Sequence, residues 1–186
     1  MGEADRALWN ERYQRQTYDF APPDWLVAFA PRLQPTVHNA RALDLACGGG
    51  RNSLLLAQLG YTVDAWDISE VALRLLATEL ERVRETRVVP RRVDLDEVQL
   101  PPDTYDLILD AHYLDRRLFE QLQRALRPGG LLLVHTFLQP PNGHYNPAHA
   151  LEPGELQRAF SDSELTTLEL GEDIANETAW LLAQRT

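Results

Sequence analysis

The chain has 186 residues, of which 44% are hydrophobic and 25% charged, the balance of a globular protein of one domain's length. A single cysteine excludes an intrachain disulfide. The 28 acidic residues outnumber the 18 basic ones and give a net charge of -10, which argues against nucleic acid and anionic membranes as partners. No apolar run reaches the roughly 20 residues of a membrane-spanning helix, and no secretory signal is visible. We therefore expect a cytoplasmic protein.

From residue 40 onward, short apolar runs alternate with helical periodicities. This alternation is typical of βα units that build a mostly parallel sheet. Ser69 is expected to cap a helix, and Gly60 to end the helix before it. Pro90 lacks an amide donor, which places its strand at a sheet edge. The first strands are predicted at 41–46, 62–66 and 88–93, and the first core helix at 52–59.

The same alternation continues through the second half of the chain. A strand at 105–110 precedes a helix carrying Leu118, Leu122 and Leu126 that is expected to end at 128–130. The continuous apolar run at 131–137 predicts a central strand covered on both faces. A further helix near 153–160 and two strands near 165–170 and 178–183 complete about seven strands. We expect one domain, in which residues 1–40 form a helical N-terminal lid segment and residues 41–186 form a Rossmann-like core.

A glycine-rich turn between the first strand and its helix is the strongest functional signal. Residues 43–52 read Leu-Asp-Leu-Ala-Cys-Gly-Gly-Gly-Arg-Asn, and glycines there let the backbone approach a nucleotide-type ligand closely. The dinucleotide fingerprint needs a glycine or alanine where this chain has Ser53. Small residues at 46, 48 and 50 with an acid at 44 instead suit a ligand without a pyrophosphate. The alternative is a tight turn that binds nothing.

Acidic residues follow the carboxyl ends of the next strands. Asp67 lies 19 residues after Gly48 (67 minus 48), close to the roughly 20 at which an acid meets ribose hydroxyls in such folds. Asp94 and Asp110 follow two further strands. Because ligands of open α/β sheets bind outside these strand ends, the pattern predicts a nucleoside-type site. For Asp67 alone, a helix-entry role is the alternative.

Together these segments resemble class I S-adenosylmethionine-dependent methyltransferases, and within them the tellurite-resistance-type (thiopurine and chalcogen) branch. The resemblance covers residues 40–137 best. It implies an α/β fold with a doubly wound, Rossmann-like, seven-stranded and mostly parallel sheet whose last strand is antiparallel. It also implies S-adenosylmethionine as cofactor and S-adenosylhomocysteine as product. The matching segments are 43–53, 61–67, 93–95, 105–108 and 126–130.

The resemblance also assigns cofactor contacts. The glycine loop would pass under the methionine part, Asp67 would accept from both ribose hydroxyls, and Asp94 would meet the adenine amino group. The segment from Trp9 to Tyr13 looks like one that folds over the cofactor, although the aromatic pair also suits plain hydrophobic cover. The full predicted set is Trp9, Arg12, Tyr13, Asp44, Ala46, Cys47, Gly48, Gly50, Arg51, Asn52, Asp67, Ile68, Asp94, Leu95, Asp110 and Ala111.

Candidate catalytic residues follow the fourth and fifth strands. His112 comes two residues after Asp110 and is the best candidate base, and Tyr113 and His135 are candidates for orienting the acceptor. A structural role is the alternative for each. His144 and His149 lack a third ligand of suitable spacing, so no metal is expected.

The expected partner is a small-molecule methyl acceptor, and the branch resemblance implies a soft nucleophile: tellurite, selenite or a thiol. The predicted assembly is a monomer or homodimer. Two alternatives remain at this point. One is a module that binds S-adenosylmethionine without catalysis, and the other is an NAD(P)-dependent oxidoreductase, against which Ser53 and Asp44 argue.

Overall fold

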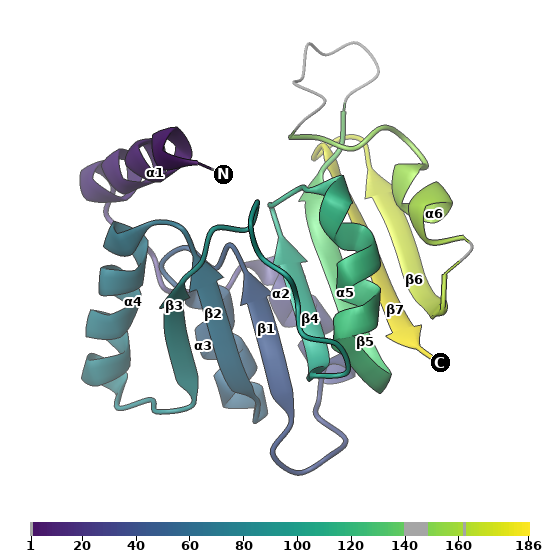
Figure 1. Ribbon diagram of the computed structural model, residues 1–186, viewed down its shortest axis with the longest axis horizontal. Coiled ribbons are helices and arrows are strands. Elements are labelled where there is room, and N and C mark those ends of the chain that lie inside the picture. Colours follow the sequence, from purple (N-terminus) through teal and green to yellow (C-terminus); the bar gives the residue numbers. More distant parts are fainter. Residues whose placement is uncertain (1, 140–148, 162) are drawn as a thin grey trace. The chain divides into compact units, whose positions relative to one another are not determined.

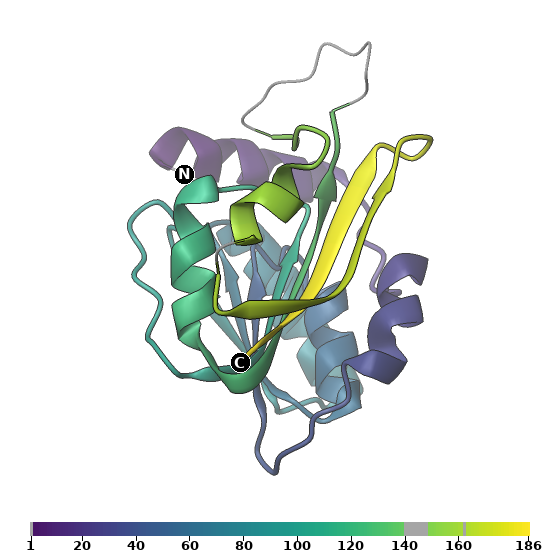
Figure 2. The same cartoon turned by 90° about the vertical axis from the view of Figure 1, so that its right-hand side faces the viewer.

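The computed structural model describes residues 2–139, 149–161 and 163–186. It divides into two compact units, residues 1–99 and 100–186, and each unit is described by itself. Their helices and strands are shown in Figure 1 and, turned by 90°, in Figure 2.

The first unit contains three parallel strands in the order β3-β2-β1. They are β1 (Arg41–Leu45), β2 (Thr62–Asp67) and β3 (Val88–Arg92). β2 lies between β1 and β3 and is buried from its second residue to its last. β3 pairs with β2 and ends the strand order, with Pro90 opposite Ala65. The edge position predicted from Pro90 is confirmed.

The helices of the first unit are α1 (Glu3–Arg15), α2 (Asp24–Phe29), the short 3-10 helix η1 (Ala30–Arg32), α3 (Arg51–Leu59) and α4 (Glu70–Val83). Both predicted caps are confirmed: Gly60 ends α3 with a φ of 112°, and the Ser69 side chain accepts a hydrogen bond from the amide of Ala72. Figure 1 shows α1 lying across the N-terminal end of α4.

The second unit contains four strands in the order β4-β5-β7-β6. They are β4 (Tyr105–Ala111), β5 (Leu126–Phe137), β6 (Leu165–Asp173) and β7 (Thr178–Arg185). β4 and β5 are parallel, whereas β7 is antiparallel to both of its neighbours. The helices are the 3-10 helix η2 (Arg116–Leu118), α5 (Phe119–Ala125) and α6 (Glu155–Phe160). Among the described residues the chain therefore has the expected seven strands, and its last strand is antiparallel as predicted.

One predicted boundary is wrong. The helix expected to run through Leu126 to Pro128 ends at Ala125, and Leu126 already belongs to β5, where it is paired with Tyr105. Leu126 fits the helical spacing, but its apolar side chain can be buried equally well from a strand. Pro128 also disfavours helical geometry at the residue before it. The register shift opposite Tyr105–Leu107 takes up the extra residues.

Among the described residues, none of the helices combines the length and the apolar character that crossing a membrane requires.

Candidate functional site

The turn after β1 has an unusual backbone. Ala46, Gly48 and Gly50 have φ values of 50°, 56° and 83°, so every second residue is left-handed. The amides of Cys47, Gly48 and Gly50 donate to the Trp66 carbonyl, the Asp67 carboxylate and the Cys47 carbonyl, so the alternation bends the chain sharply while its amides stay bonded. Ala46 adopts this conformation despite its methyl group, at a penalty of about 1–2 kcal/mol relative to the right-handed form.

Neighbouring side chains leave no room for a Cβ on this turn. A Cβ at Gly48 would collide with the hydroxyl oxygen of Tyr13, and one at Gly49 would lie 2.5–2.8 Å from ring carbons of Tyr18. The turn is therefore built for close approach to its backbone, and in this structure two tyrosines make that approach.

Asp44, at the end of β1, lies directly beneath the turn. It is fully buried, and its Oδ2 accepts a hydrogen bond from the Ser53 hydroxyl at 2.5 Å. Burial raises the pKa of Asp44 to about 7, and the Ser53 hydrogen bond opposes that rise. In the described part of the chain, Asp44 Oδ1 and the buried Asn52 Oδ1 have no hydrogen-bond partner. Two unpartnered buried acceptors beside a glycine turn fit a cationic N–H donor such as an amino group.

Asp67 ends β2 and ties it to the glycine turn. Its Oδ2 accepts from the amide of Gly48 at 2.8 Å, and its Oδ1 accepts from the amide of Ser69 at 2.7 Å. Burial raises the pKa of Asp67, although the amide donors oppose the rise. A carboxylate has about four lone-pair sites, so these two bonds leave acceptor capacity for ligand hydroxyls.

Aromatic residues of the N-terminal segment cover the turn. The rings of Trp9 and Tyr13 lie 6.3 Å apart, those of Tyr13 and Tyr18 lie 5.9 Å apart, and the Arg12 guanidinium lies 5.0 Å from the centre of the Trp9 ring. Burial raises the pKa of Tyr13, and it raises that of Tyr18 to about 12. Both phenols therefore stay protonated at neutral pH. Sequence reasoning missed Tyr18 because it lies beyond the end of α1, where helical spacing carries no information.

The other predicted residues of this unit have clear places. Ile68 and Leu95 are buried, Arg51 is the half-buried first residue of α3, and the Asp94 carboxylate accepts from the amide of Asp96 in the turn after β3. Burial raises the pKa of the Cys47 thiol well above its usual range, which keeps Cys47 in the unreactive thiol form at neutral pH.

The second unit groups the candidate catalytic residues. The amide of His112, directly after β4, donates to the carbonyl of His135 at 2.8 Å. The His112 ring lies 5.3 Å from that of His135 and 4.8 Å from that of Phe137, and the ring of Trp180 is stacked on His135 at 6.4 Å. We call these four residues the ring cluster. Burial, with a smaller effect of His112, lowers the pKa of His135 to about 4.

The remaining candidates of the second unit lie beside the ring cluster in the sequence. Asp110 is buried near the end of β4, and Ala111 and Tyr113 are half-buried. Trp180 was not expected from sequence, because it joins the cluster only through the pairing of β7 with β5. Among residues 2–139, 149–161 and 163–186, no group of three or more potential ligands could hold a metal ion. His144 lies outside the described residues.

Residues 42–130 match a protein family described as a methyltransferase domain. This stretch of the chain is a methyltransferase domain. A ubiquinone biosynthesis O-methyltransferase of Rhizobium leguminosarum is 31% identical over 111 residues, which cover 57% of this chain and 44% of that protein. A probable S-adenosyl-L-methionine-dependent methyltransferase, TehB of Haemophilus influenzae, is 30% identical over 101 residues, or 50% of this chain and 35% of that protein.

The likeness extends to the fold. The crystal structure of TehB from Haemophilus influenzae matches with a TM-score of 0.76 and 21% identity, covering 96% of this chain and 67% of that one. The Rossmann-like methyltransferase fold predicted for this chain is thereby confirmed. The chain spans about half the length of the curated relatives it matches.

Proposed function

We propose that the protein is an S-adenosylmethionine-dependent methyltransferase that acts on a small molecule. The observation that carries the proposal is the geometry around the glycine turn: left-handed residues at 46, 48 and 50, the unpartnered Asp44 Oδ1 beneath them, and the Asp67 carboxylate bound to Gly48. Asp44 Oδ1 could accept from an amino group, and Asp67 could accept from ribose hydroxyls. The glycine turn would let a ligand pack directly against the backbone.

The contacts expected for Asp67, Ile68, Asp94 and Leu95 are kept in this proposal, and the unpartnered oxygens of Asp44 and Asn52 add a new one. Asp44 and Asn52 would accept from the methionine amino group, and Asp67 would accept from the ribose hydroxyls. Around the adenine, Ile68 would pack on the ring while Asp94 and the Leu95 backbone meet its polar edge. The residues assigned to the remaining contacts with the methionine part and the sulfonium are Trp9, Arg12, Tyr13, Ala46, Cys47, Gly48, Gly50, Arg51, Asp110 and Ala111.

S-adenosylmethionine, when bound, supplies a methyl group on a positively charged sulfur. The protein's part is to exclude water, to align the acceptor in line with that methyl group and, where needed, to take a proton from the acceptor. Electron-rich rings attract a cationic sulfur, which gives Trp9 and Tyr13 a role beyond cover. His112 is proposed as the base, with Tyr113 and His135 orienting the acceptor.

The proposed acceptor is a soft nucleophile, either a thiol or a chalcogen oxyanion such as tellurite or selenite. The arginines of the second unit favour the thiol. All six of them, Arg116, Arg117, Arg124, Arg127, Arg158 and Arg185, are ion-paired with carboxylates. An oxyanion that depended on one of them would have to compete with that pair, whereas the accessible apolar rings of Phe137 and Trp180 suit a neutral thiol.

Two other uses of this fold are less well supported. An NAD(P)-dependent oxidoreductase would need glycine or alanine at position 53, whereas this chain has Ser53, whose hydroxyl donates to the buried Asp44. A module that binds S-adenosylmethionine without catalysis would have the same glycine turn, and only an activity measurement separates it from an enzyme.

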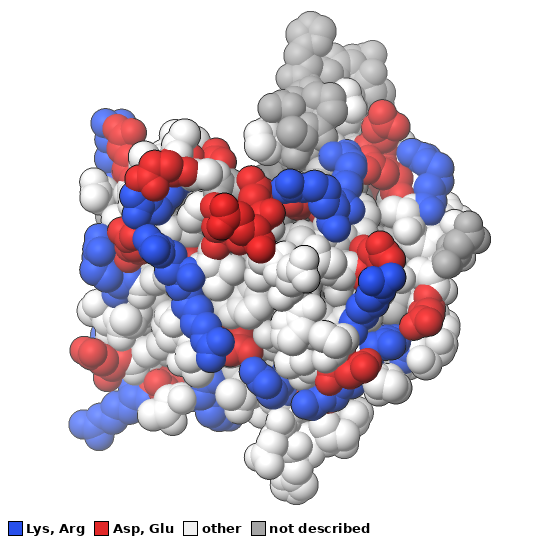
Figure 3. Space-filling model, in the orientation of Figure 1, with Lys and Arg blue, Asp and Glu red and all other residues white. Residues whose placement is uncertain are grey.

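The surface supports small-molecule partners. Figure 3 shows arginine and acidic side chains interspersed on the face that it presents, and the net charge is -10. Phosphate backbones favour clustered cations. We therefore propose that the protein does not bind nucleic acid. We also propose that it acts as a monomer or homodimer, and that it works in the cytoplasm, as its single cysteine suggested.

The test begins with calorimetry. S-adenosylhomocysteine and S-adenosylmethionine should bind, and NAD and NADP should not. Asp67→Ala removes hydrogen bonds that are worth roughly 1.5–3 kcal/mol each when one partner is charged, so S-adenosylhomocysteine affinity should fall at least about tenfold. An unchanged dissociation constant in a folded variant would refute the ribose assignment. A screen of thiols, tellurite and selenite, scored by S-adenosylhomocysteine formation, then separates an enzyme from a binding module.

A further inference from the structure

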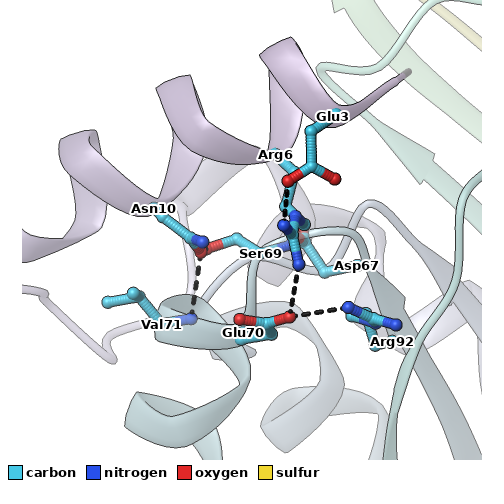
Figure 4. Close-up of polar contacts among 8 residues, drawn as sticks. All are labelled: Glu3, Arg6, Asn10, Asp67, Ser69, Glu70, Val71 and Arg92. Atoms are coloured by element: carbon cyan, nitrogen blue, oxygen red, sulfur yellow. Dashed lines mark hydrogen bonds and ion pairs between the residues drawn. The ribbon is translucent and has the colours of Figure 1, made fainter.

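No side chain of the N-terminal helix α1 is fully buried: Trp9 and Tyr13 are half-buried, and Leu8 is 60% exposed. Surface helices usually dock through a continuous apolar stripe, so polar contacts contribute to fixing the position of α1. The described polar contacts between α1 and the rest of its unit concentrate on Arg6 and Asn10 (Figure 4).

Asn10 caps a helix to which it does not belong. Its Oδ1 accepts from the Ser69 hydroxyl at 2.8 Å and from the amide of Val71 at 3.3 Å. The first amides of a helix have no partner within that helix. Ser69 satisfies the amide of Ala72 at 3.1 Å, whereas the amide of Val71 is satisfied from α1. The N-terminus of α4 is thus completed by a residue 61 positions earlier in the chain.

The same contacts lead to Asp67. The amide of Ser69 donates to Asp67 Oδ1 at 2.7 Å, and Asp67 Oδ2 accepts from the amide of Gly48 at 2.8 Å. Gly48 in turn faces the hydroxyl of Tyr13. Tyr13 and Asn10 are three residues apart on α1 and share one side of the helix. The contacts therefore form a closed circuit that starts and ends on α1 and passes through Asp67.

From this circuit we propose that Asn10 is a positioning residue that couples α1 to the Asp67 carboxylate. By holding the N-terminus of α4, Asn10 fixes the Ser69 amide that aims Asp67, and it places Tyr13 on the glycine turn at the same time. Loss of Asn10 should loosen both ends of the circuit together. The inference rests on the proposed function, in which Asp67 binds the cofactor ribose.

Arg6 offers a matched control on the same helix. It lies one turn before Asn10 and bridges to Glu70 at 3.0 Å, and Arg92 bonds the same carboxylate at 2.6 Å. These groups are partly exposed, and exposed ion pairs contribute little and are screened by salt. Arg6→Ala removes an attachment of α1 to α4 without touching the path from Asn10 to Asp67.

The experiment compares S-adenosylhomocysteine binding by calorimetry in wild type, Asn10→Ala, Asn10→Asp and Arg6→Ala. Asn10→Ala should weaken binding at least fivefold, and Arg6→Ala less than twofold. Asn10→Asp keeps the acceptor oxygen and places a negative charge at a helix N-terminus, where it is favourable, so it should recover affinity to within about threefold of wild type. Hydrogen exchange in the Asn10→Ala variant should quicken both in α1 and in residues 67–72.

A double-mutant cycle tests the coupling itself. In an Asp67→Asn background, which disturbs the ribose contact but keeps the side-chain shape, Asn10→Ala should lose much of its effect, because the two residues act through one path. Additive effects, equal losses for Asn10→Ala and Arg6→Ala, or wild-type affinity in Asn10→Ala would each overturn the inference. If Asn10→Ala does not fold, Asn10→Gln, which shifts the amide by one methylene, is measured in its place. Failure of the wild type to bind S-adenosylhomocysteine would instead refute the proposed function.

Discussion

The Asp67 carboxylate accepts a hydrogen bond from the amide of Gly48 at 2.8 Å, which joins the end of β2 to the turn after β1. The two residues are 19 positions apart, and the bond is buried. This bond fixes the glycine turn against the Asp67 carboxylate. The other carboxylate oxygen accepts from the amide of Ser69, the residue that caps α4. A ligand that meets Asp67 therefore also meets the glycine turn, and the two features work as one surface.

Gly48→Ala should damage both stability and cofactor binding. The left-handed φ of 56° costs an alanine about 1–2 kcal/mol, and the new Cβ would collide with the Tyr13 hydroxyl. We expect S-adenosylhomocysteine affinity to fall at least tenfold by calorimetry. Gly129→Ala is the control, since Gly129 has a φ of 81° but no atom within 4 Å of an added Cβ. It should show the loss of stability alone, and equal binding losses in the two variants would contradict the proposed role of the turn.

Asp44 should make stability depend on pH. Its pKa is about 7 in the folded protein against about 3.9 in an unfolded chain, so the folded state prefers the protonated form. Below about pH 4 both states are protonated. Between pH 4 and 7 the unfolded chain ionises first, and the free energy of unfolding should fall by up to about 1.4 kcal/mol per pH unit. Above pH 7 the effect levels off.

Asp44→Asn isolates this effect, because the amide keeps an oxygen for the Ser53 hydroxyl. Urea denaturation of both proteins from pH 4.5 to 7.5 should show the variant gaining stability relative to wild type as pH rises. Stability curves that run parallel over this range would show that Asp44 does not titrate as described.

Cofactor binding should release a proton from Asp44. A ligand amino group beside the carboxylate favours its charged form and lowers its pKa. Calorimetry of S-adenosylhomocysteine binding at pH 6.5, in two buffers of different ionisation enthalpy, should therefore report net proton release in wild type. The release should be reduced in Asp44→Asn, and equal release in both proteins would assign the proton to another group.

Cys47 should resist alkylation in the folded protein. It is buried, with a pKa raised well above that of a free thiol, and the thiolate is the reactive form. At pH 8, labelling by iodoacetamide, followed by mass spectrometry, should be more than about tenfold slower than in urea. The chain has one cysteine, so the mass shift is unambiguous. Rapid labelling of the folded protein would contradict this prediction and show that Cys47 is accessible and reactive.

His112 should matter most for a protonated acceptor. General-base help is worth about 10²–10⁴-fold in rate, so His112→Ala should lose less than about 10²-fold in turnover with an ionised acceptor and more with a protonated thiol. His135, whose pKa is about 4, stays neutral above pH 5 and cannot account for an inflection near neutral pH. A large loss that is the same for both acceptors would leave His112 as a shape contact.

The predicted site shows where local pattern is sufficient. The run 43–53 specifies a strand, a glycine turn and a helix through neighbouring residues alone, and the structure has all three. The hydrogen bond between Gly48 and Asp67 was not predicted. Their spacing suggested only a shared ligand site, and the bond forms because parallel neighbouring strands bring their ends together. The helix predicted through Leu126 was wrong because the alternative use of that residue, in a strand opposite Tyr105, depends on a distant segment.

The sequence by itself determined the class of fold, the glycine turn and the order of the acidic strand ends, since each follows from side-chain periodicity or from the backbone freedom of nearby residues. The tertiary structure decided which side chains meet. Asn10 completes the cap of α4, Tyr18 reaches Gly49, and Trp180 stacks on His135. Each of these contacts joins residues that are 31 to 61 positions apart in the sequence. No local propensity encodes such contacts, because their energy exists only once both partners have been brought together.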